Sequence, residues 1–381
     1  MSLKCWNWRF RIFFDEELLA EVNDFLEQLE PAEKKIYSEI VKFYTGFYSV
    51  QILLDNISEQ PERSAEYIEE ALRDRKKIIY LPDSLYEYYH KKITDIHLPD
   101  DLKNKLYRIL ESAKNANSIY EEYLELCKIV YGPSFEKMLE VARREGDKTV
   151  AVPRSVSVKN EIREVYEELY SKHTQNAELV EKFGESKLSD FEVSVMPGQA
   201  FAEWWDEEIA PQGKDLLVLY QNEDSQYYND LKYTIYHETY PGHGQFYRTL
   251  SDRRSHMFDH GAISIVEGWA TYAEWHSEDS DYIRAVRKNA LYFLSLLSTQ
   301  NFKSVDELLI QNKLKQGYSM DAALQSVVNA TQSIGFAESY YYGALWLELF
   351  LEEKKIAPKD FLAFLSERNV IEGFAVWDTI Y

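Results

Sequence analysis

The chain has 381 residues, 45% of them hydrophobic, enough for one large domain or two of ordinary size. Its formal net charge of −22 would repel a phosphate backbone, which argues against broad nucleic-acid binding. The two cysteines, Cys5 and Cys127, offer neither a disulfide framework nor a cysteine-based metal cluster. The N-terminal residues carry charge early and contain no long apolar run, so we expect a cytoplasmic protein without membrane contact.

The first half of the chain is predicted to be helical. Pro31 stands where a helix can begin, and apolar residues follow it at spacings of three and four, from Ile36 to Val50. Similar periodicity predicts helices over roughly 64–79, 101–130 and 158–183. The segment 145–159 is expected to cross between helices without regular structure.

The spacing of apolar residues changes near residue 190, from every three or four residues to every second residue. Phe191, Val193 and Val195 alternate with polar residues, which predicts a half-buried strand over 191–196, and the apolar run 216–220 could pair with it. Asn229 or Asp230 is a plausible cap for a helix that carries His237. Further helices are expected at about 264–276, 281–298, 304–316, 320–331, 336–354 and 358–367.

These patterns predict a mostly α protein with a small β hairpin or sheet beside the helix of the candidate site. We divide the chain into an N-terminal helical region, 1–185, and a candidate catalytic region, 186–381. The two are expected to form one continuous fold around a cleft.

The segment 236–247, YHETYPGHGQFY, opens like H-E-x-x-H, the helical zinc signature of metallopeptidases. The second histidine, His243, is six residues after His237 instead of four. On a regular helix the two would be about 120° out of phase and roughly 9 Å apart along the axis. One zinc ion needs ligand nitrogens within roughly 3–4 Å of each other, so an unbroken helix cannot form this site.

Pro241 and Gly242 could repair the spacing. Pro241 cannot donate to the carbonyl of His237, and Gly242 permits backbone angles that other residues avoid. A Pro-Gly bulge that absorbs two residues would return His243 to the place of an i+4 histidine. The alternative is that the Pro-Gly pair ends the helix and His243 begins a loop.

A third ligand is available downstream. Glu267 lies among apolar residues and would be costly to bury unless it were paired or bound to a metal. Alternatively, Ser264 and Glu267 could form a capping box at a helix start. Glu274 lies two turns later on nearly the same face. It could orient a ligand histidine by a hydrogen bond to the ring nitrogen that does not bind the metal, or remain a solvated charge.

These motifs resemble those of the domain-of-unknown-function 885 family, which is related to the H-E-x-x-H zinc peptidases with a glutamate third ligand. The family pattern H-E-x-x-P-G-H-H matches residues 237–243, and E-G-W-A-x-Y-A-E matches 267–274. The strand and proline at 193–197 and the Tyr-x-x-Gly segment at 340–343 are similar as well. The resemblance covers roughly the C-terminal half. Gly244 departs from it, because the family has a second histidine there.

The resemblance implies a multi-helix zinc-peptidase-like fold and a hydrolase acting on short peptides. Zinc would be bound by His237, His243 and Glu267, and Glu238 would act as general base. Tyr340 would donate a hydrogen bond to the oxyanion. A carboxypeptidase would also need a cation for the terminal carboxylate, and five arginines are available: Arg248, Arg253, Arg254, Arg284 and Arg287.

Two other classes of function compete. Loss of a ligand at Gly244 would favour a binding or scaffold protein that keeps the fold without the metal. A di-metal helical oxidase needs two Glu-x-x-His pairs, and the chain offers only Glu87 and His90, with no matching pair around 237–276.

Overall fold

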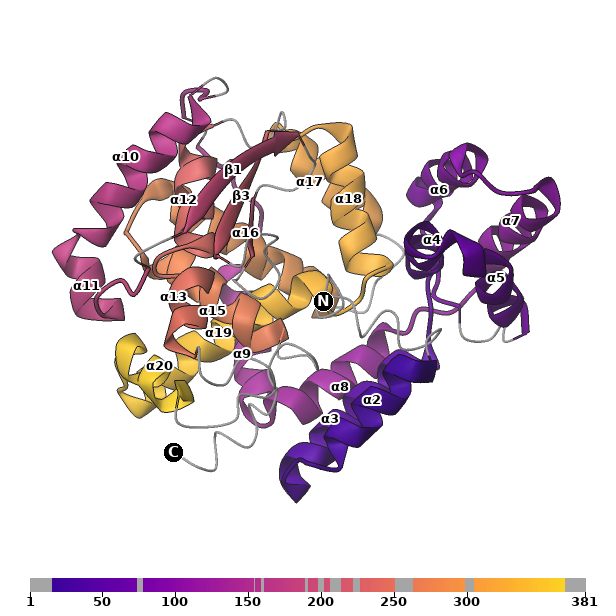
Figure 1. The fold of residues 1–381 in the computed structure, drawn as a ribbon, viewed down its shortest axis with the longest axis horizontal. Coiled ribbons are helices and arrows are strands. Elements are labelled where there is room, and N and C mark those ends of the chain that lie inside the picture. The colour runs from indigo at the N-terminus through magenta and orange to yellow at the C-terminus, as the bar shows by residue number, and fades with distance from the viewer. Residues whose placement is uncertain are drawn as a thin grey trace.

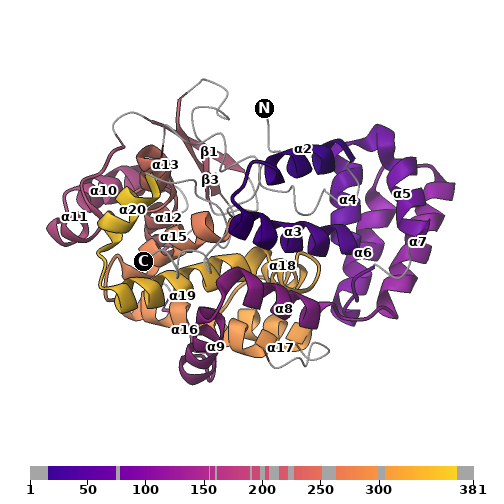
Figure 2. The same cartoon turned by 90° about the horizontal axis from the view of Figure 1, so that it is seen from below.

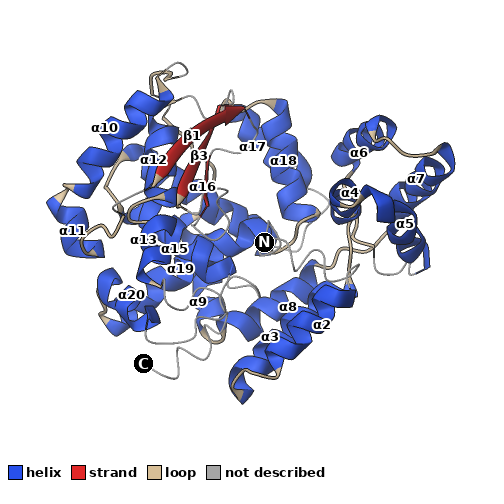
Figure 3. Cartoon of the chain, in the orientation of Figure 1, coloured by secondary structure: helices blue, strands red, loops and turns tan. Residues whose placement is uncertain are grey.

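The computed structural model describes residues 16–73, 78–153, 155–158, 161–188, 191–197, 202–205, 214–221, 227–250, 263–298 and 305–366. The described chain is mostly α-helical, with one three-stranded mixed sheet, so the predicted fold class is confirmed (Figure 3). No described helix is both long and apolar enough to span a membrane.

Helices fill the N-terminal half, and α4 to α7 gather at the end of the molecule remote from the sheet (Figure 1). The elements are α2 (Glu16–Leu26), α3 (Pro31–Gly46), α4 (Val50–Glu59), η1 (Pro61–Arg63), α5 (Ser64–Arg73), α6 (Asp83–Asp95), α7 (Asp100–Lys114), α8 (Tyr120–Tyr131), α9 (Ser134–Glu145), α10 (Ile162–Thr174) and α11 (Ala177–Phe183).

The start at Pro31 is confirmed, and Ile36, Ile40 and Phe43 face the core. Between α9 and α10 the described residues form no helix or strand, as predicted for 145–159.

Three predicted helices were too long. The helix from residue 64 ends at Arg73, and the backbone N–H of Ile79 donates to Tyr48 O at 2.8 Å. The segment 101–130 divides into α7 and α8 at 115–119, where Asn and Ser side chains compete for backbone hydrogen bonds. The third, 158–183, divides at Asn176, whose side chain caps α11 by accepting from Glu178 and Leu179.

The sheet has three strands in the order β1-β3-β2. The predicted strands β1 (Glu192–Pro197) and β3 (Leu216–Gln221) pair as expected but run parallel, with Val193 opposite Leu217. A strand that the sequence did not predict, β2 (Ala202–Trp205), pairs antiparallel with β3 on its other side. Its four residues are too few to show a clear alternation. Parallel strands need a connection that crosses over, so β1 and β3 do not form a hairpin, and of the two expected forms, a hairpin or a sheet, the structure has the sheet.

The remaining helices are α12 (Tyr228–Glu238), α13 (His243–Thr249), α15 (Ile263–His276), α16 (Asp281–Ser298), α17 (Val305–Lys315), α18 (Met320–Thr331), α19 (Phe336–Lys354) and α20 (Pro358–Ser366). The predicted bounds from 264 onward agree with these to within a residue or two. Neither Asn229 nor Asp230 caps α12: the cap position is Tyr227, and Asp230 accepts a hydrogen bond from the Tyr282 hydroxyl.

Helices α15 and α19 pack backbone against backbone at two glycines. A Cβ atom on Gly343 would lie 2.0 Å from the carbonyl oxygen of Ser264, and one on Gly268 would lie 2.6 Å from the Cα of Gly343. No other residue fits at these two positions without separating the helices. The contact places Glu267 of α15 near Tyr340 of α19.

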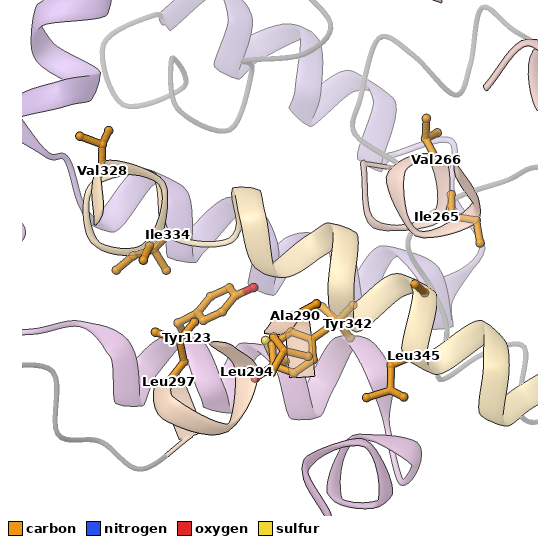
Figure 4. Packing of buried hydrophobic residues seen from close by; sticks show 14 of the residues in the cluster. Tyr123, Ile265, Val266, Ala290, Leu294, Leu297, Val328, Ile334, Tyr342 and Leu345 are labelled. Carbon is orange, nitrogen blue, oxygen red and sulfur yellow. The ribbon is translucent and has the colours of Figure 1, made fainter. Parts of the chain in front are cut away.

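One continuous cluster of buried apolar side chains joins the two halves. In Figure 4, Tyr342 of α19 lies beside Ala290 and Leu294 of α16, and Leu297 of α16 lies beside Tyr123 of the N-terminal half. In the view from below, α19 runs through the middle of the molecule with α8 and α18 near it (Figure 2). The site helices are therefore anchored in the main core.

Candidate metal centre

The spacing between His237 and His243 is repaired by a break between two helices. Helix α12 ends at Glu238, and α13 begins at His243. The turn between them is closed by a hydrogen bond from Gln245 N–H to Thr239 O, 3.1 Å long. A Cβ atom on Gly242 would lie 1.8 Å from the carbonyl oxygen of His237, so the turn requires glycine. The prediction of a bulge that continues the helix was wrong. The alternative was right that the helix ends before His243, but His243 begins helix α13 and not a loop.

The break brings the two imidazoles together. Their ring centroids are 4.8 Å apart and the rings are nearly perpendicular, at 89°. His237, Glu238 and His243 form a group whose candidate ligand atoms all lie within 4.8 Å of one another. This arrangement can hold a metal ion.

Glu267 of α15 lies against both histidines. Its side chain is fully buried, and Oε2 is 3.3 Å from Nε2 of His237 and 3.3 Å from Nε2 of His243. Ligands joined to one zinc ion by bonds of about 2.0–2.1 Å at tetrahedral angles lie about 3.3 Å apart. Each of these two contacts therefore has the spacing of neighbouring zinc ligands.

A buried hydrogen bond joins the two sequence motifs. The indole Nε1 of Trp269 donates to the carbonyl oxygen of Pro241 at 2.9 Å, which ties α15 to the turn between α12 and α13. Sequence reasoning did not assign this role to Trp269. The sequence did offer a signal, because Trp269 stands two residues after Glu267 in the motif already singled out.

Helix α15 begins at Ile263, so Glu267 lies in its second turn. The capping-box alternative for Ser264 and Glu267 is therefore wrong, since a capping glutamate belongs in the first turn. A buried carboxylate in this position needs a cation or a hydrogen-bond donor.

The electrostatics of this cluster favour an ion pair between a protonated His237 and an ionised Glu267. Burial opposes a charged His237, but hydrogen bonds to Glu267 and Glu274 outweigh it and raise the pKa of His237 to about 10. Burial likewise opposes a charged Glu267, yet the two histidines lower the pKa of Glu267 to about 2. The carboxylate thus stays ionised and is stabilised by positive charge beside Oε2, from a protonated imidazole or from a metal ion.

Glu238 is buried beside these candidate ligands. Its exposed fraction is 8%, and Oε2 has no hydrogen-bond partner among the described residues. Burial raises the pKa of Glu238, an effect that His243 and His237 partly offset. A carboxyl group with a raised pKa beside a candidate metal site suits proton transfer near neutral pH.

Tyr340 is half-buried on α19, and its ring lies parallel to that of His237, with centroids 5.9 Å apart and 9° between planes. Burial, Glu267 and Glu238 all raise the pKa of Tyr340 well above its ordinary value. The hydroxyl therefore stays protonated and is able to donate a hydrogen bond.

Glu274 contacts the far side of His237. Its Oε2 lies 3.5 Å from Nδ1 of His237, and the side chain is 18% exposed. A carboxylate on Nδ1 keeps the proton there and turns Nε2 toward Glu267. Glu274 is thus a partner of His237 and not a solvated helix charge.

Gly244 has little room for a side chain. A Cβ atom there would lie 2.8 Å from Cδ1 of Leu188 and 3.1 Å from the carbonyl oxygen of Thr239. His243, one residue earlier, is the histidine that reaches Glu267.

Each candidate arginine that the structure describes has an acidic partner. Arg248 pairs with Asp215 at 2.8 Å, Arg284 pairs with Asp279 and Asp281, and Arg287 pairs with Glu145 and Glu348. Arg253 and Arg254 lie outside the described residues. The structure therefore does not single out a cation for a terminal carboxylate.

The Glu-x-x-His pair on α6 belongs elsewhere. Glu87 and His90 are both exposed, and the ring of His90 stacks on Tyr107 at 4.7 Å. Helix α6 lies at the opposite end of the molecule from α12 and α13 (Figure 1). This placement gives no support to a di-metal oxidase.

No family model matches the chain, and none of the curated proteins matches it. The solved structures with a similar fold include the following two. One is a "putative lipoprotein" from Colwellia psychrerythraea, with 14% identity, a TM-score of 0.59, and coverage of 96% of this chain and 89% of that one. The other is a "putative lipoprotein of unknown function" from Shewanella oneidensis, with 15% identity, a TM-score of 0.53, and coverage of 96% and 92%. At these identities the likeness concerns the fold.

Proposed function

We propose that this chain is a zinc-dependent hydrolase that cleaves peptide bonds in short peptides. The observation that carries the proposal is the contact of one buried carboxylate oxygen, Oε2 of Glu267, with Nε2 of both His237 and His243 at 3.3 Å. Two imidazoles and a carboxylate with this spacing suit zinc, and the resemblance of the two motifs to the domain-of-unknown-function 885 family favours the same ligand set.

In this proposal His237, His243 and Glu267 hold the metal. A zinc ion with three protein ligands supplies an acidified water molecule and polarises the substrate carbonyl. Glu238 accepts the proton of the attacking water and passes it to the nitrogen of the leaving amine as the peptide C–N bond breaks. The Tyr340 hydroxyl donates a hydrogen bond to the carbonyl oxygen as negative charge develops on it. Glu274 positions His237.

The test combines metal analysis with cleavage. Protein purified without chelator and supplied with zinc is expected to contain close to one zinc per chain and to cleave members of a mixed peptide library. Glu238→Gln should retain the zinc and lose the cleavage. Zinc-loaded protein that cleaves no library member would contradict the proposal, as would unchanged cleavage by Glu238→Gln.

A second candidate is a binding or scaffold protein without metal. One observation favours it: protonated His237 can satisfy Glu267 without a metal, because hydrogen bonds to Glu267 and Glu274 raise the pKa of His237 to about 10. The scaffold predicts no zinc under zinc supplementation, whereas the hydrolase predicts stoichiometric zinc.

Two proposals can be made for the location of the protein in the cell. The sequence favours the cytoplasm, whereas both structural neighbours are described as putative lipoproteins, which favours attachment to a membrane surface. Fractionation of cells that express the native gene, with and without detergent, decides between them.

A further inference from the structure

A carboxylate outside the proposed ligand set lies near the candidate metal centre. Glu203 is the second residue of β2, an edge strand of the sheet that packs against α12, the helix of His237 and Glu238. Burial raises the pKa of Glu238, and the negative charges of Glu267 and Glu203 raise it further. Because such electrostatic effects fade with distance, Glu203 belongs to the immediate surroundings of Glu238.

Two neutral donors hold the Glu203 carboxylate in place. Successive side chains of a strand point to opposite faces, so Glu203 and Trp205 share the face opposite to Trp204, which is buried in the core. The indole Nε1 of Trp205 donates to Oε2 of Glu203 at 2.7 Å. Burial and the Glu203 carboxylate raise the pKa of Tyr220 on β3, whose hydroxyl also donates to Glu203.

Glu203 has no cationic partner among the described residues. Its side chain is half-buried, so water screens its charge less than it would on an open surface. Two neutral donors orient the carboxylate but leave its full negative charge in place. A cation bound there would form charge-assisted hydrogen bonds, which are about twice as strong as neutral ones.

The charges around the candidate metal centre favour a cation as well. The carboxylates of Glu267 and Glu274 lie against His237, and the two positive charges of a zinc ion would balance them. Glu203 then retains its charge without a counter-charge. The candidate arginines that the structure describes each pair with an acid, so the same surroundings offer no comparable anchor for an anion.

We propose that Glu203 binds a positively charged group of the substrate, either a free α-amino group or the side chain of a lysine or arginine. The ammonium or guanidinium group donates hydrogen bonds to the Glu203 carboxylate, and this contact positions a nearby peptide bond at the metal centre. The inference rests on the proposed peptidase function and adds a substrate class to it.

The test measures peptide binding to the full-length Glu238→Gln protein supplied with zinc, so that cleavage does not consume the probes. One pair of probes is Ala-Ala-Ala-Ala-amide with a free amino group and its N-acetyl form. The other pair is N-acetyl-Lys-Ala-Ala-Ala-amide and its counterpart with Met in place of Lys. At about pH 7 most of the amino groups are charged, and isothermal titration is expected to show a Kd about tenfold or more lower for the cationic member of at least one pair.

The two pairs distinguish the two sources of the positive charge. A preference within the first pair identifies recognition of the N-terminus, and a preference within the second identifies recognition of a side chain. Equal affinities within both pairs would overturn the proposal.

Glu203→Gln in the same background removes the charge and keeps an acceptor for Trp205. The preference for the cationic probe should disappear, through a loss of about tenfold or more in its affinity, while binding of the neutral probes and the zinc content stay the same. Glu192 is exposed on β1, at the opposite edge of the sheet, so Glu192→Gln is a control with the same change in net charge. It should keep the preference.

Glu203→Lys provides a second variant with a different signature. It should reverse the preference, so that N-acetyl-Glu-Ala-Ala-Ala-amide binds more tightly than the Lys probe. A preference for cationic probes that survives in folded Glu203→Gln would refute the role of Glu203. Loss of zinc from Glu203→Gln would also refute it, because the residue would then act on the metal.

The outcomes separate this inference from the proposed function. Cleavage that depends on Glu238 and is equally fast for cationic and neutral peptides would retain the peptidase and refute the role of Glu203. Selective binding of a cationic probe through Glu203, without cleavage of any peptide by the wild-type protein, would retain the cation site and refute the peptidase.

Discussion

Glu267 and Glu338 are both fully buried glutamates, one on α15 and one on α19, and their pKa values shift in opposite directions. Two histidines lower the pKa of Glu267 to about 2, against the effect of burial. Burial raises the pKa of Glu338 to about 8, because only backbone hydrogen bonds oppose it. One of these bonds runs from Gly335 N–H to Oε2 of Glu338, 3.1 Å long, and Oε1 has no hydrogen-bond partner among the described residues.

The comparison shows that burial alone does not determine the charge of a carboxyl group. Glu267 is ionised because cationic partners surround it, which is the environment of a metal ligand. Glu338 is neutral at moderate pH and helps to close the first turn of the helix that carries Tyr340. Each of the following predictions alters one side of this comparison, and they run from the largest expected effect to the smallest.

The largest effect is expected from Glu267→Gln. Replacing an anionic ligand with an amide should reduce zinc affinity by more than about 100-fold, since changes to residues behind the ligands already cost 10- to 100-fold. Competition with a zinc chelator measures it. Glu338→Gln is the matched control and should leave zinc affinity unchanged. Zinc affinity that falls equally in both variants would show that Glu267 acts only through the fold.

His243→Ala should abolish stoichiometric zinc binding, because the described residues around Glu267 offer no other imidazole in the place of His243. The zinc content of dialysed protein measures this effect. Retained stoichiometry would mean that another group, such as Glu238, completes the ligand set.

Glu274→Gln should have a smaller effect on the metal. It keeps a hydrogen-bond acceptor near Nδ1 of His237 but removes the negative charge, so zinc affinity should fall by about 10-fold and by no more than about 100-fold. The same chelator competition serves. A loss as large as that of Glu267→Gln would make Glu274 a ligand itself.

Glu338→Gln should change the pH dependence of stability. The folded-state pKa of Glu338 is raised from the ordinary 4.5 to about 8, so the unfolded state releases this proton first. The wild-type free energy of unfolding should therefore fall as pH rises from about 4.5 to 8, by up to a few kcal/mol. The variant has no carboxyl group to titrate at this position, so it should be more stable than wild type at pH 9 but not at pH 5. Urea denaturation at both pH values tests it, and parallel pH profiles would contradict it.

Trp269→Phe should have the smallest effect. It keeps most of the buried ring and removes the donor to Pro241 O, which should cost about 1–3 kcal/mol of unfolding free energy. Urea denaturation of the zinc-free protein measures the change. An unaltered midpoint would show that the bond does not stabilise the turn.

The helices with strong periodicity were predictable because their signal is local. From residue 281 onward the predicted bounds nearly coincide with those of α16 to α20. The signals for these bounds are local, because the apolar spacing lies within each helix and a cap such as Ser319 directly precedes its helix. The overlong prediction over 101–130 failed because apolar periodicity continues across the break, whereas the interruption depends on a few Asn and Ser side chains.

The sequence by itself determined which residues were candidates for chemistry: His237, Glu238, His243, Glu267 and Tyr340 all stood out before their positions were known. Only the tertiary structure decided how they meet. The approach of His243 to Glu267, the backbone contact of Gly268 with Gly343 and the parallel pairing of β1 with β3 are contacts between segments, and periodicity within one segment carries no information about them. The same limit applies to the packing of β2 against α12, which brings Glu203 near Glu238. Interactions between residues close in sequence determine where the helices form. Packing between distant segments determines which helix faces meet at one site.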